Sequence, residues 1–390
     1  MKSPLFTEEM LKEPMIDVVS YLKQMRMEAG QGLIDLSVGN PDLPPCQDAI
    51  DELVRRSAQT NIHGYGNFDG QPCLIDSIIR YYKTRYGVDV ARNEINITRG
   101  VRTMLFSTAC IFTSPGDLVL VPSIGYQSYF LGATFCHAQP YFIPMPEDNC
   151  FVPRLRELPE DVLRRAKLLY LNYPNNPIGS QITHEQLQEI VDICREYEIL
   201  LLYDNAYNEI VFDGRKPVSL LEIEGGKEIG IEVTSMSKLT CLAGWRIAFC
   251  VSSAETAKYI WNYNALADSA VFDGFQFAGA KALDYVTDHD DGKRLAHIYQ
   301  QRRDIVLEGL DAAGLKYYRP EGGFYVWINV PEGMTDYEFS REVCRKCKVL
   351  LTPGSYYGPE GARFVRISLT ASPEKLREAA KRIAEYRDTE

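Results

Sequence analysis

The sequence predicts an α/β protein with a mostly parallel sheet covered by helices on both faces, plus a smaller α+β domain. Short apolar runs without polar alternation occur at 118–121, 168–171 and 199–203, which is typical of strands buried on both faces. Segments with apolar residues at helical spacing separate these runs. After about residue 285 the pattern changes, because a polar helix leads into several strand-like segments. This order of elements favours a large α/β unit followed by a small α+β unit.

Changes in pattern along the chain divide it into three predicted parts. They are an N-terminal arm with a small-domain segment at 1–45, a large domain at 46–285 and a small C-terminal domain at 286–390. The arm contains one predicted helix, with apolar residues at helical spacing within 15–22. Such an arm has little apolar surface to bury against itself, so we expect it to lie on a partner subunit.

Three glycine-containing turns stand out in the first 100 residues. A short apolar strand runs into Gly39 and several prolines, so irregular backbone follows it. Backbone around a glycine can approach a ligand closely, although an ordinary turn also fits Gly39 taken alone. A second, glycine-rich loop presents Tyr65. A strand at 95–98 then enters a helix through Gly100, and the unpaired N–H groups that open a helix can bind phosphate.

Strands and helices alternate through the middle of the chain. Thr183 and Gln186 form a capping box, which predicts the start of a helix. Further strands are expected at 231–233 and 246–251. The last third begins with a polar helix that carries Arg302.

The C-terminal third continues with strand-like segments at 322–330 and 363–370. Arg303 stands beside Arg302 on the polar helix before them, and Ser372 is placed to cap a final amphipathic helix.

Composition limits the class of protein. The chain has 390 residues, of which 45% are hydrophobic and 24% charged, as is ordinary for a soluble globular enzyme. The net charge of -11 argues against a nucleic-acid partner. No apolar run approaches the roughly 18 residues that span a bilayer, and the N-terminus lacks the apolar core of an export signal. We therefore expect no membrane association and a cytoplasmic location.

The ten cysteines are expected to be reduced thiols in that compartment. Cys344 and Cys347 form a C-x-x-C on a helical stretch, with no second pair and no nearby histidine. We interpret them as packing residues and predict no metal site.

The clearest chemical signal is the run T-S-M-S-K-L-T-C-L-A-G-W-R at 234–246. Ser235 and Ser237 supply small hydroxyls, Arg246 supplies a fixed positive fork, and Lys238 supplies an amine between them. The amine can form a Schiff base with an aldehyde, while the hydroxyls and guanidinium hold a dianion. Pyridoxal 5′-phosphate is the cofactor that needs both functions at once. A lone lysine is more often a solvated surface charge, but its neighbours favour the cofactor here.

Three polar residues follow the ends of predicted parallel strands. Asn176, Asp204 and Lys238 should therefore converge, because ligands bind at the carboxyl ends of such strands. A buried Asp204 is costly unless paired, and a protonated pyridine nitrogen would pair it and keep the ring an electron sink. Tyr207 is placed to hydrogen-bond the phenolic oxygen of that ring. A helix or turn cap is the alternative role for Asp204.

These motifs resemble the class I/II aminotransferases, which belong to fold type I of the pyridoxal phosphate enzymes. The resemblance runs from about residue 33 to 370 and is carried by S-V-G-N-P, Y-G-N-F-D-G, N-Y-P-N-N-P-I-G, Y-D-N-A-Y, S-M-S-K-L-T-C-L-A-G-W-R and F-V-R-I-S. It implies a large domain with a seven-stranded type of sheet. It also implies a homodimer that moves an amino group between an L-amino acid and a 2-keto acid.

The resemblance implies a role for each matching residue. Lys238 resembles the Schiff-base lysine, which afterwards carries a proton between substrate Cα and cofactor C4′. Asp204 resembles the partner of the pyridine nitrogen. The other cofactor roles are binding of the phenolic oxygen by Tyr207 and Asn176, ring stacking by Tyr126, and phosphate binding by Ser235, Ser237, Arg246 and the backbone at Val101 and Arg102.

Substrate and subunit contacts are implied in the same way. Arg366 matches the arginine that binds the substrate α-carboxylate as a bidentate pair. Gly39 matches the loop glycine that closes over the substrate, and Asn176 also lies on the substrate side. Tyr65 matches the tyrosine that reaches the phosphate of the neighbouring subunit's cofactor, which implies the homodimer.

Within the family, D-N-A-Y-N-E-I-V-F-D-G, G-F-Y-V-W and L-T-P-G-S most resemble the LL-diaminopimelate and alanine/aspartate-type branch. The chain departs from that branch at 100–103, where G-V-R-T replaces glycine–serine–lysine–glutamate, at Gln127, where proline is usual, and at Leu-Thr-Cys 239–241. These positions are expected to line or neighbour the substrate space. The substrate side chain therefore stays open between acidic, basic and aromatic.

The same departures leave alternatives to transamination. One is an oxidase, hydroxylase or lyase acting on an amino acid on the same scaffold. Another is the sensory half of a pyridoxal-phosphate-type transcription regulator, which would require an attached basic helix-turn-helix where this sequence has the arm.

Overall fold

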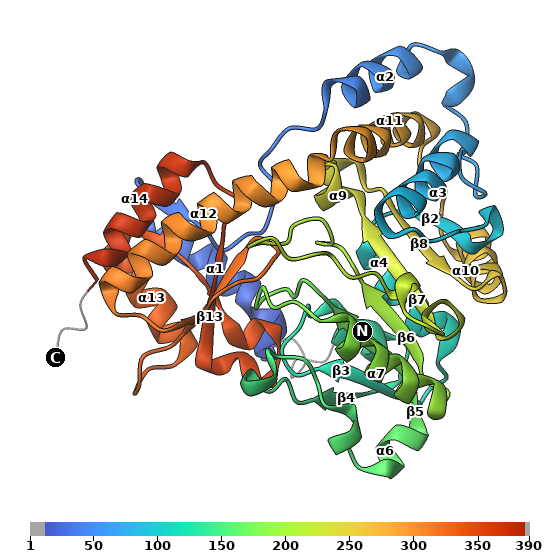
Figure 1. The fold of residues 1–390 in the computed structure, drawn as a ribbon. Coiled ribbons are helices and arrows are strands. Elements are labelled where there is room, and N and C mark those ends of the chain that lie inside the picture. Colours follow the sequence, from blue (N-terminus) through green and yellow to red (C-terminus); the bar gives the residue numbers. More distant parts are fainter. Residues whose placement is uncertain (1–11, 387–390) are drawn as a thin grey trace, which may run out of the picture.

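The computed structural model describes residues 12–386 and has two lobes, each built around its own sheet (Figure 1). Residues 1–11 of the predicted N-terminal arm lie outside the described residues. The predicted division at residues 45 and 285 stays a prediction. The α/β class is confirmed, because a seven-stranded sheet covered by helices forms the larger lobe.

The larger sheet is mostly parallel, as predicted. Its strand order is β2-β8-β7-β6-β5-β3-β4, and β8 runs antiparallel to both of its neighbours. Consecutive residues of a strand enter different apolar clusters, as Leu168 and Leu169 of β5 do. The strands are β2 (Ile95–Thr98), β3 (Leu118–Pro122), β4 (Gln139–Ile143), β5 (Ala166–Asn172), β6 (Leu200–Asp204), β7 (Gly230–Ser235) and β8 (Ala248–Ser252).

Helices connect and cover these strands. The predicted capping box is present, since Thr183 accepts from the Gln186 backbone and Gln186 reaches back to the Thr183 backbone. It stops the chain from fraying where α7 begins. The helices of this lobe are α2 (Gln47–Ser57), α3 (Pro72–Tyr86), α4 (Val101–Phe112), α5 (Ser128–Phe135), α6 (Glu160–Arg165), α7 (His184–Glu196), α8 (Gly226–Ile229), α9 (Met236–Leu239), α10 (Ala254–Ala267) and α11 (Asp273–His289).

The smaller lobe combines an antiparallel sheet with four helices. The sheet order is β12-β13-β10-β9, and a separate parallel pair joins β1 to β11. Ser372 caps the last helix, as predicted, by accepting from the Lys375 backbone. The elements are β1 (Ile34–Asp35), β9 (Tyr317–Tyr318), β10 (Tyr325–Asn329), β11 (Val349–Leu350), β12 (Thr352–Pro353), β13 (Phe364–Ser368), α1 (Pro14–Ala29), α12 (Asp291–Ala313), α13 (Asp336–Cys347) and α14 (Pro373–Ala384).

Helix α12, which the sequence predicts to be polar, has two buried arginines. Arg302 and Arg303 of α12 are 3% and 0% exposed. Arg302 pairs with Asp42 at 2.7 Å between Nη1 and Oδ1, and Arg303 pairs with Asp213 at 2.7 Å between Nη1 and Oδ2. Paired charges can be buried where unpaired ones cannot, and periodicity in the sequence does not reveal such long-range partners.

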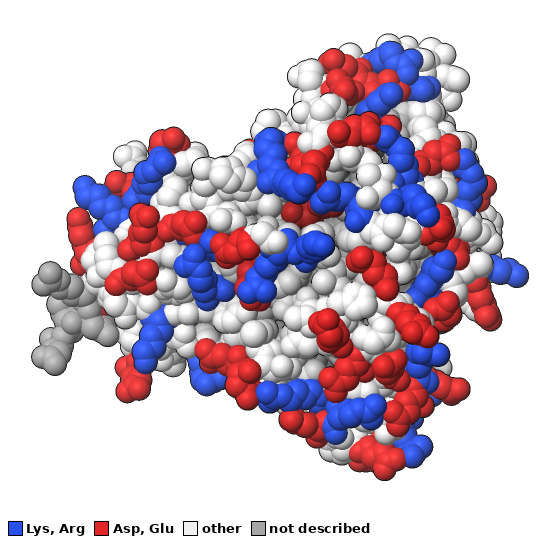
Figure 2. All heavy atoms as spheres, viewed as in Figure 1, with Lys and Arg blue, Asp and Glu red and all other residues white. Residues whose placement is uncertain are grey.

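Two further features bear on the sequence predictions. Cys344 and Cys347 are both buried on α13, which fits a packing role. Among the helices between residues 12 and 386, none combines the length and apolarity that a membrane span requires. On the face drawn in Figure 2, acidic and basic side chains are interspersed.

Candidate active site

The predicted site residues gather around one cavity of about 750 Å³. It lies at the carboxyl ends of the neighbouring parallel strands β5, β6 and β7, and β10 and β13 of the smaller lobe also contribute to its wall. Tyr65 does not line it and is fully exposed to solvent. The predicted residues that do line the cavity are Gly39, Val101, Arg102, Tyr126, Asn176, Asp204, Tyr207, Ser235, Ser237, Lys238, Arg246 and Arg366.

Asp204 ends strand β6 and is only 4% exposed. Its Oδ2 accepts a hydrogen bond from the Tyr129 hydroxyl at 2.9 Å, and its Oδ1 accepts from the Ala206 backbone at 3.2 Å. Burial raises the pKa of Asp204 to about 6, although these two hydrogen bonds and the charge of Lys238 work against that rise. The carboxylate is therefore held in place and would gain from a cationic partner in the cavity.

Lys238 lies on the short helix α9, directly after β7. Its Nζ donates to the Gly39 carbonyl at 3.3 Å. Burial lowers the pKa of Lys238 to about 8, and the positive charges of Arg366 and Arg246 lower it further, while Asp204 opposes them. About a tenth of this amine is consequently uncharged at pH 7, and the uncharged form is the one that acts as a nucleophile or general base.

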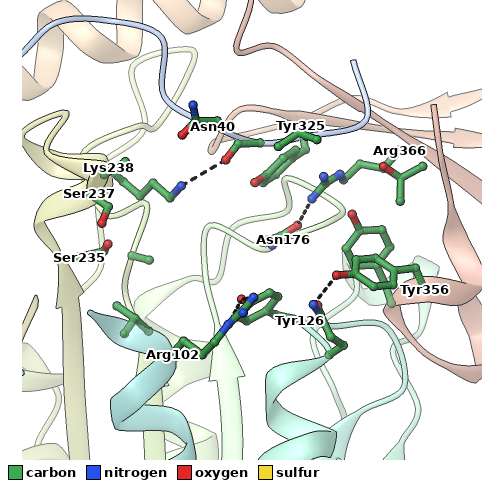
Figure 3. A pocket seen from close by; sticks show the side chains of 18 of the residues that line it. Asn40, Arg102, Tyr126, Asn176, Ser235, Ser237, Lys238, Tyr325, Tyr356 and Arg366 are labelled. Atoms are coloured by element: carbon green, nitrogen blue, oxygen red, sulfur yellow. Dashed lines mark hydrogen bonds between the residues drawn. The ribbon is translucent and has the colours of Figure 1, made fainter. Parts of the chain in front are cut away.

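A group of anion-binding elements lies at the same end of the sheet. Helix α4 opens at Val101 directly after Gly100, whose φ of 89° suits glycine. A side chain at position 100 would collide with the guanidinium of Arg246. Ser235 and Ser237 lie beside Lys238, on the side of the cavity away from Arg366 (Figure 3). Arg246 has no carboxylate partner among residues 12–386, so its charge is available to an anion.

Arg366 is buried on β13 and projects from the side of the cavity opposite Lys238 (Figure 3). Its Nη1 donates to Asn176 Oδ1 at 2.9 Å, and its Nη2 donates to the Ser37 carbonyl at 2.8 Å. The guanidinium carbon lies 4.0 Å from the centre of the Tyr325 ring, and Nε has no hydrogen-bond partner. Within the described chain no carboxylate pairs with it. A buried cation of this kind is matched by an anionic ligand.

Asn176 and Tyr207 connect the two sides of the cavity. The Asn172 side chain accepts from the Asn176 backbone at 2.8 Å, which fixes the start of the loop after β5. The hydroxyls of Tyr207 and Tyr325 lie 3.3 Å apart. Gly39 passes so close to the Tyr325 hydroxyl that a side chain there would collide with it.

The backbone run 37–39 crosses the cavity and contacts both cationic groups. The Ser37 carbonyl accepts from Arg366, and the Gly39 carbonyl accepts from Lys238. Thr352 and Thr370 donate to the carbonyls of Ser37 and Val38, at 2.7 and 3.1 Å, and thus tie the run to the smaller lobe.

Several contacts within the cavity were not predicted from the sequence. Tyr129 lies shortly after Tyr126, but nothing in the sequence connects it to Asp204. The Gln127 amide bonds the hydroxyl of Tyr356, and Arg102 Nε donates to the Tyr126 hydroxyl at 2.9 Å. The rings of Tyr325 and Tyr357 flank Arg366, and the motifs that contain or adjoin these tyrosines do not indicate that contact.

The departures from the branch lie in different places around the cavity. Arg102 and Gln127 line it, whereas the residues at 239–241 do not line it and adjoin it only through Lys238. Leu239 packs in the apolar cluster beneath α9, and Thr240 is buried with its hydroxyl bonded to the Met236 carbonyl at 2.7 Å. The helical turn after Lys238 therefore points Leu239 and Thr240 into the lobe.

Comparison with known proteins identifies the kind of chain that carries such a cavity. The family model described as aminotransferase class I and II matches residues 31–383. The LL-diaminopimelate aminotransferase of Moorella thermoacetica is 36% identical over 358 residues, which cover 91% of each chain. The enzyme of the same name from Aquifex aeolicus is 36% identical over 362 residues, or 93% of each chain.

Solved structures give a consistent likeness. Substrate-bound BacF from Bacillus subtilis superimposes with a TM-score of 0.89 at 34% identity, covering 94% of both chains. A probable N-succinyldiaminopimelate aminotransferase from Thermus thermophilus gives a TM-score of 0.88 at 33% identity, covering 94% of this chain and 99% of the other. None of these relatives is named as an oxidase, hydroxylase or lyase.

Proposed function

This chain belongs to the class I and II aminotransferase family, and from that premise we propose how its cavity performs the reaction of an aminotransferase. In the proposed reaction an amino group moves between an L-amino acid and a 2-keto acid, with pyridoxal 5′-phosphate as cofactor. The single observation that carries the proposal is that a buried amine of lowered pKa, Lys238, shares one cavity with buried Asp204 and buried Arg366.

The residues of the cavity fit the cofactor. Asp204 is a buried carboxylate without a cationic partner at hydrogen-bond distance, and a protonated ring nitrogen supplies one. The N-terminus of α4, Ser235, Ser237 and Arg246 offer donors and positive charge for a phosphate. Lys238 offers an amine for an aldehyde. When bound, the cofactor supplies that aldehyde and a protonated ring that withdraws electrons from substrate Cα.

Proton movement falls to Lys238. With a pKa of about 8, its Nζ accepts a proton from substrate Cα in the uncharged form and gives it up again afterwards. The Gly39 carbonyl holds the amine in the cavity by the 3.3 Å hydrogen bond. Tyr129 keeps Asp204 oriented toward the cavity through the whole cycle.

Substrate orientation falls to Arg366. Its buried guanidinium binds the α-carboxylate as a fork, which places Cα toward the Lys238 side of the cavity. Asn176 fixes one arm of the fork. Because Arg366 is buried, this charge pair is worth more than it would be on the surface.

The preferred amino donor is proposed to carry a second carboxylate at its far end. Arg102 supports this proposal, because it lines the cavity and its side-chain hydrogen bonds go to the Tyr126 hydroxyl rather than to a carboxylate of the described chain. Relatives named for LL-diaminopimelate and N-succinyldiaminopimelate agree with such a donor. Arg102 and Arg366 would then hold the two ends of the substrate.

A substrate panel tests both parts of the proposal. Purified protein saturated with pyridoxal phosphate is mixed anaerobically with single amino acids, and the spectral conversion of the cofactor and the keto acid formed are recorded. Diaminopimelate, glutamate and aspartate should convert the cofactor faster than alanine or phenylalanine, and Arg102→Gln should remove that preference. Keto acid forming solely when oxygen is consumed would disprove transamination, and a preference unchanged in Arg102→Gln would disprove the role of Arg102.

The cofactor site is also proposed to be completed by a second copy of the chain. Tyr65 is fully exposed and outside the cavity of its own subunit, although the family resemblance assigns it to a phosphate. In a homodimer it would reach the phosphate in the partner's cavity. A cytoplasmic location remains part of this proposal.

A further inference from the structure

Two cysteine side chains meet where α4 packs against α5, outside the lining of the active-site cavity. Cys110 lies in the last turn of α4, and Cys136 directly follows α5. Their sulfur atoms are 2.7 Å apart, which is closer than unbonded sulfurs in ordinary contact. A disulfide bond measures about 2.05 Å, so a small approach of the two atoms would form one.

The packing around the pair keeps the two helices in this register. The rings of Phe106 and Phe135 contact each other edge to face, with centres 5.4 Å apart. Gly132 of α5 has no side chain where the Leu105 carbonyl of α4 passes, since an added Cβ would lie 3.2 Å from that oxygen. Both contacts lie on the N-terminal side of the two cysteines, and they keep the sulfur-bearing ends of the helices close together.

The two thiols have different accessibility and acidity. Cys110 is exposed, while Cys136 is half-buried. The hydrogen bond from Cys136 lowers the pKa of Cys110 to about 6, with a smaller contribution from the Tyr263 hydroxyl, although burial opposes it. The same bond raises the pKa of Cys136. An exposed thiolate beside a second thiol is the arrangement found in redox-sensing cysteines.

We propose that Cys110 and Cys136 form a modification site at which a peroxide closes a disulfide between α4 and α5. The Cys110 thiolate attacks one oxygen of hydrogen peroxide, so that an S–O bond forms, the O–O bond breaks, and hydroxide leaves and is protonated to water. The Cys136 sulfur then attacks the Cys110 sulfur, an S–S bond forms, and the second hydroxide leaves with the Cys136 proton as water. Two thiols lose two electrons and two protons, and one peroxide becomes two waters.

The other cysteines lack this combination. Cys194 and Cys250 are buried, and burial raises the pKa of each thiol to about 12. Cys150 is exposed, but no other cysteine sulfur lies within bonding reach of it in the described chain. It therefore serves as the matched control for a solvent-accessible thiol.

Formation of this disulfide would affect two elements of the active site. Helix α4 begins at Val101 and Arg102, and α5 begins directly after Tyr126 and Gln127, so one covalent bond would join the far ends of both cavity-lining segments. A bond between residues 26 apart in sequence also restricts the unfolded chain. The oxidised protein should therefore have a higher thermal midpoint than the reduced protein.

The test treats the reduced holoenzyme with one equivalent of hydrogen peroxide, blocks free thiols and analyses the peptides by mass spectrometry. The expected product is a pair of peptides joined through Cys110 and Cys136, lighter by two hydrogen atoms than the two reduced peptides. Dithiothreitol should reverse this cross-link, and it should form equally in Cys150→Ser. In Cys136→Ser, Cys110 should instead accumulate as a sulfenic acid that dimedone traps. Oxidation of Cys150 before Cys110, or equal dimedone labelling of Cys110 in wild type and Cys136→Ser, would overturn the proposal. If Cys136→Ser does not fold, the thermal midpoint of the wild type is the test. A rise on oxidation that dithiothreitol reverses supports the proposal, and the absence of a rise overturns it.

Discussion

The Tyr129 hydroxyl donates a hydrogen bond to Asp204 Oδ2 at 2.9 Å, inside the protein. The bond joins helix α5, which follows the Tyr126 segment, to the end of β6. It lowers the pKa of a carboxyl that burial raises, and so it keeps Asp204 anionic over a wider pH range than burial alone would allow.

Replacing Tyr129 with phenylalanine should weaken cofactor binding by roughly 10- to 100-fold, because a hydrogen bond to a charged group contributes about 1.5–3 kcal/mol. The loss should be larger at pH 6 than at pH 8.5, since the pKa of Asp204 rises when this donor is removed. Fluorescence titration with pyridoxal phosphate measures it. Tyr173→Phe is the control, because this buried hydroxyl bonds the Phe151 carbonyl instead. Equal losses in both variants would contradict the role of Tyr129.

The cofactor-free protein should lose stability as pH rises through the range in which Asp204 ionises. Burial raises the folded pKa of Asp204 to about 6 from its ordinary 3.8, so the folded state binds more protons than the unfolded state between these values. The resulting penalty, on the order of 3 kcal/mol, is absent below pH 3.8 and complete above pH 6. Urea unfolding of wild type and Asp204→Asn should show a difference that shrinks as pH falls. A difference that does not vary with pH would contradict the shifted pKa.

Uptake of pyridoxal phosphate by the cofactor-free protein should accelerate with pH and level off with a midpoint near 8. The uncharged amine is the nucleophile, and burial lowers the pKa of Lys238 to about 8. Stopped-flow absorbance records the rate, and borohydride reduction should leave the cofactor attached to residue 238. Lys238→Ala should bind the cofactor through its phosphate contacts without becoming reducible. A midpoint near 10.5 would mean that the lysine is not buried in solution.

Changing Arg366 to leucine should raise KM for amino acids by roughly 100-fold or more, because a buried bidentate charge pair is lost. Amines without an α-carboxylate should react at unchanged rates, and this comparison is the internal control. Steady-state kinetics with an amino acid and the corresponding amine measure the ratio. If both substrates suffer equally, Arg366 supports the structure of the cavity rather than the carboxylate.

Mixing two inactive variants should restore activity if Tyr65 acts in the partner's cavity. In a mixed dimer of Tyr65→Ala and Lys238→Ala subunits, one cavity would hold both native residues. Activity should therefore recover toward one quarter of the wild-type value after subunit exchange at equal concentrations, and sedimentation should show a dimer. No recovery in an exchanged dimer would place Tyr65 in the cavity of its own subunit or outside the reaction.

Local signals in the sequence predicted the parts of the fold that local physics decides. The uniformly apolar run before Asp204 predicted a buried strand, and the Thr183 box predicted the start of α7. Convergence of Asp204 and Lys238 followed from the rule that parallel strands share one carboxyl edge. The cavity residues with family motifs were predicted by resemblance, and their shared cavity agrees with it.

Contacts between distant segments were not predictable in this way. The ion pair of Arg302 with Asp42 spans 260 residues, so α12 was expected to be polar although it is buried at this point. Tyr325 of β10 contacts Arg366 of the neighbouring strand β13, and the register of these two strands cannot be predicted from the sequence. Leu239 faces the apolar cluster rather than the substrate because of the way α9 is rotated about its axis, which the sequence does not reveal.

The carbonyls of Ser37 and Gly39 accept hydrogen bonds from Arg366 and Lys238. A ligand that accepts a hydrogen bond from either side chain replaces the bond to the carbonyl. The binding free energy therefore gains only the difference between the new hydrogen bond and the one it replaces. Because both carbonyls belong to one short backbone run, releasing one end loosens the other. Arrival of a carboxylate at the arginine should therefore free the amine for chemistry, which would make substrate binding itself the trigger for turnover.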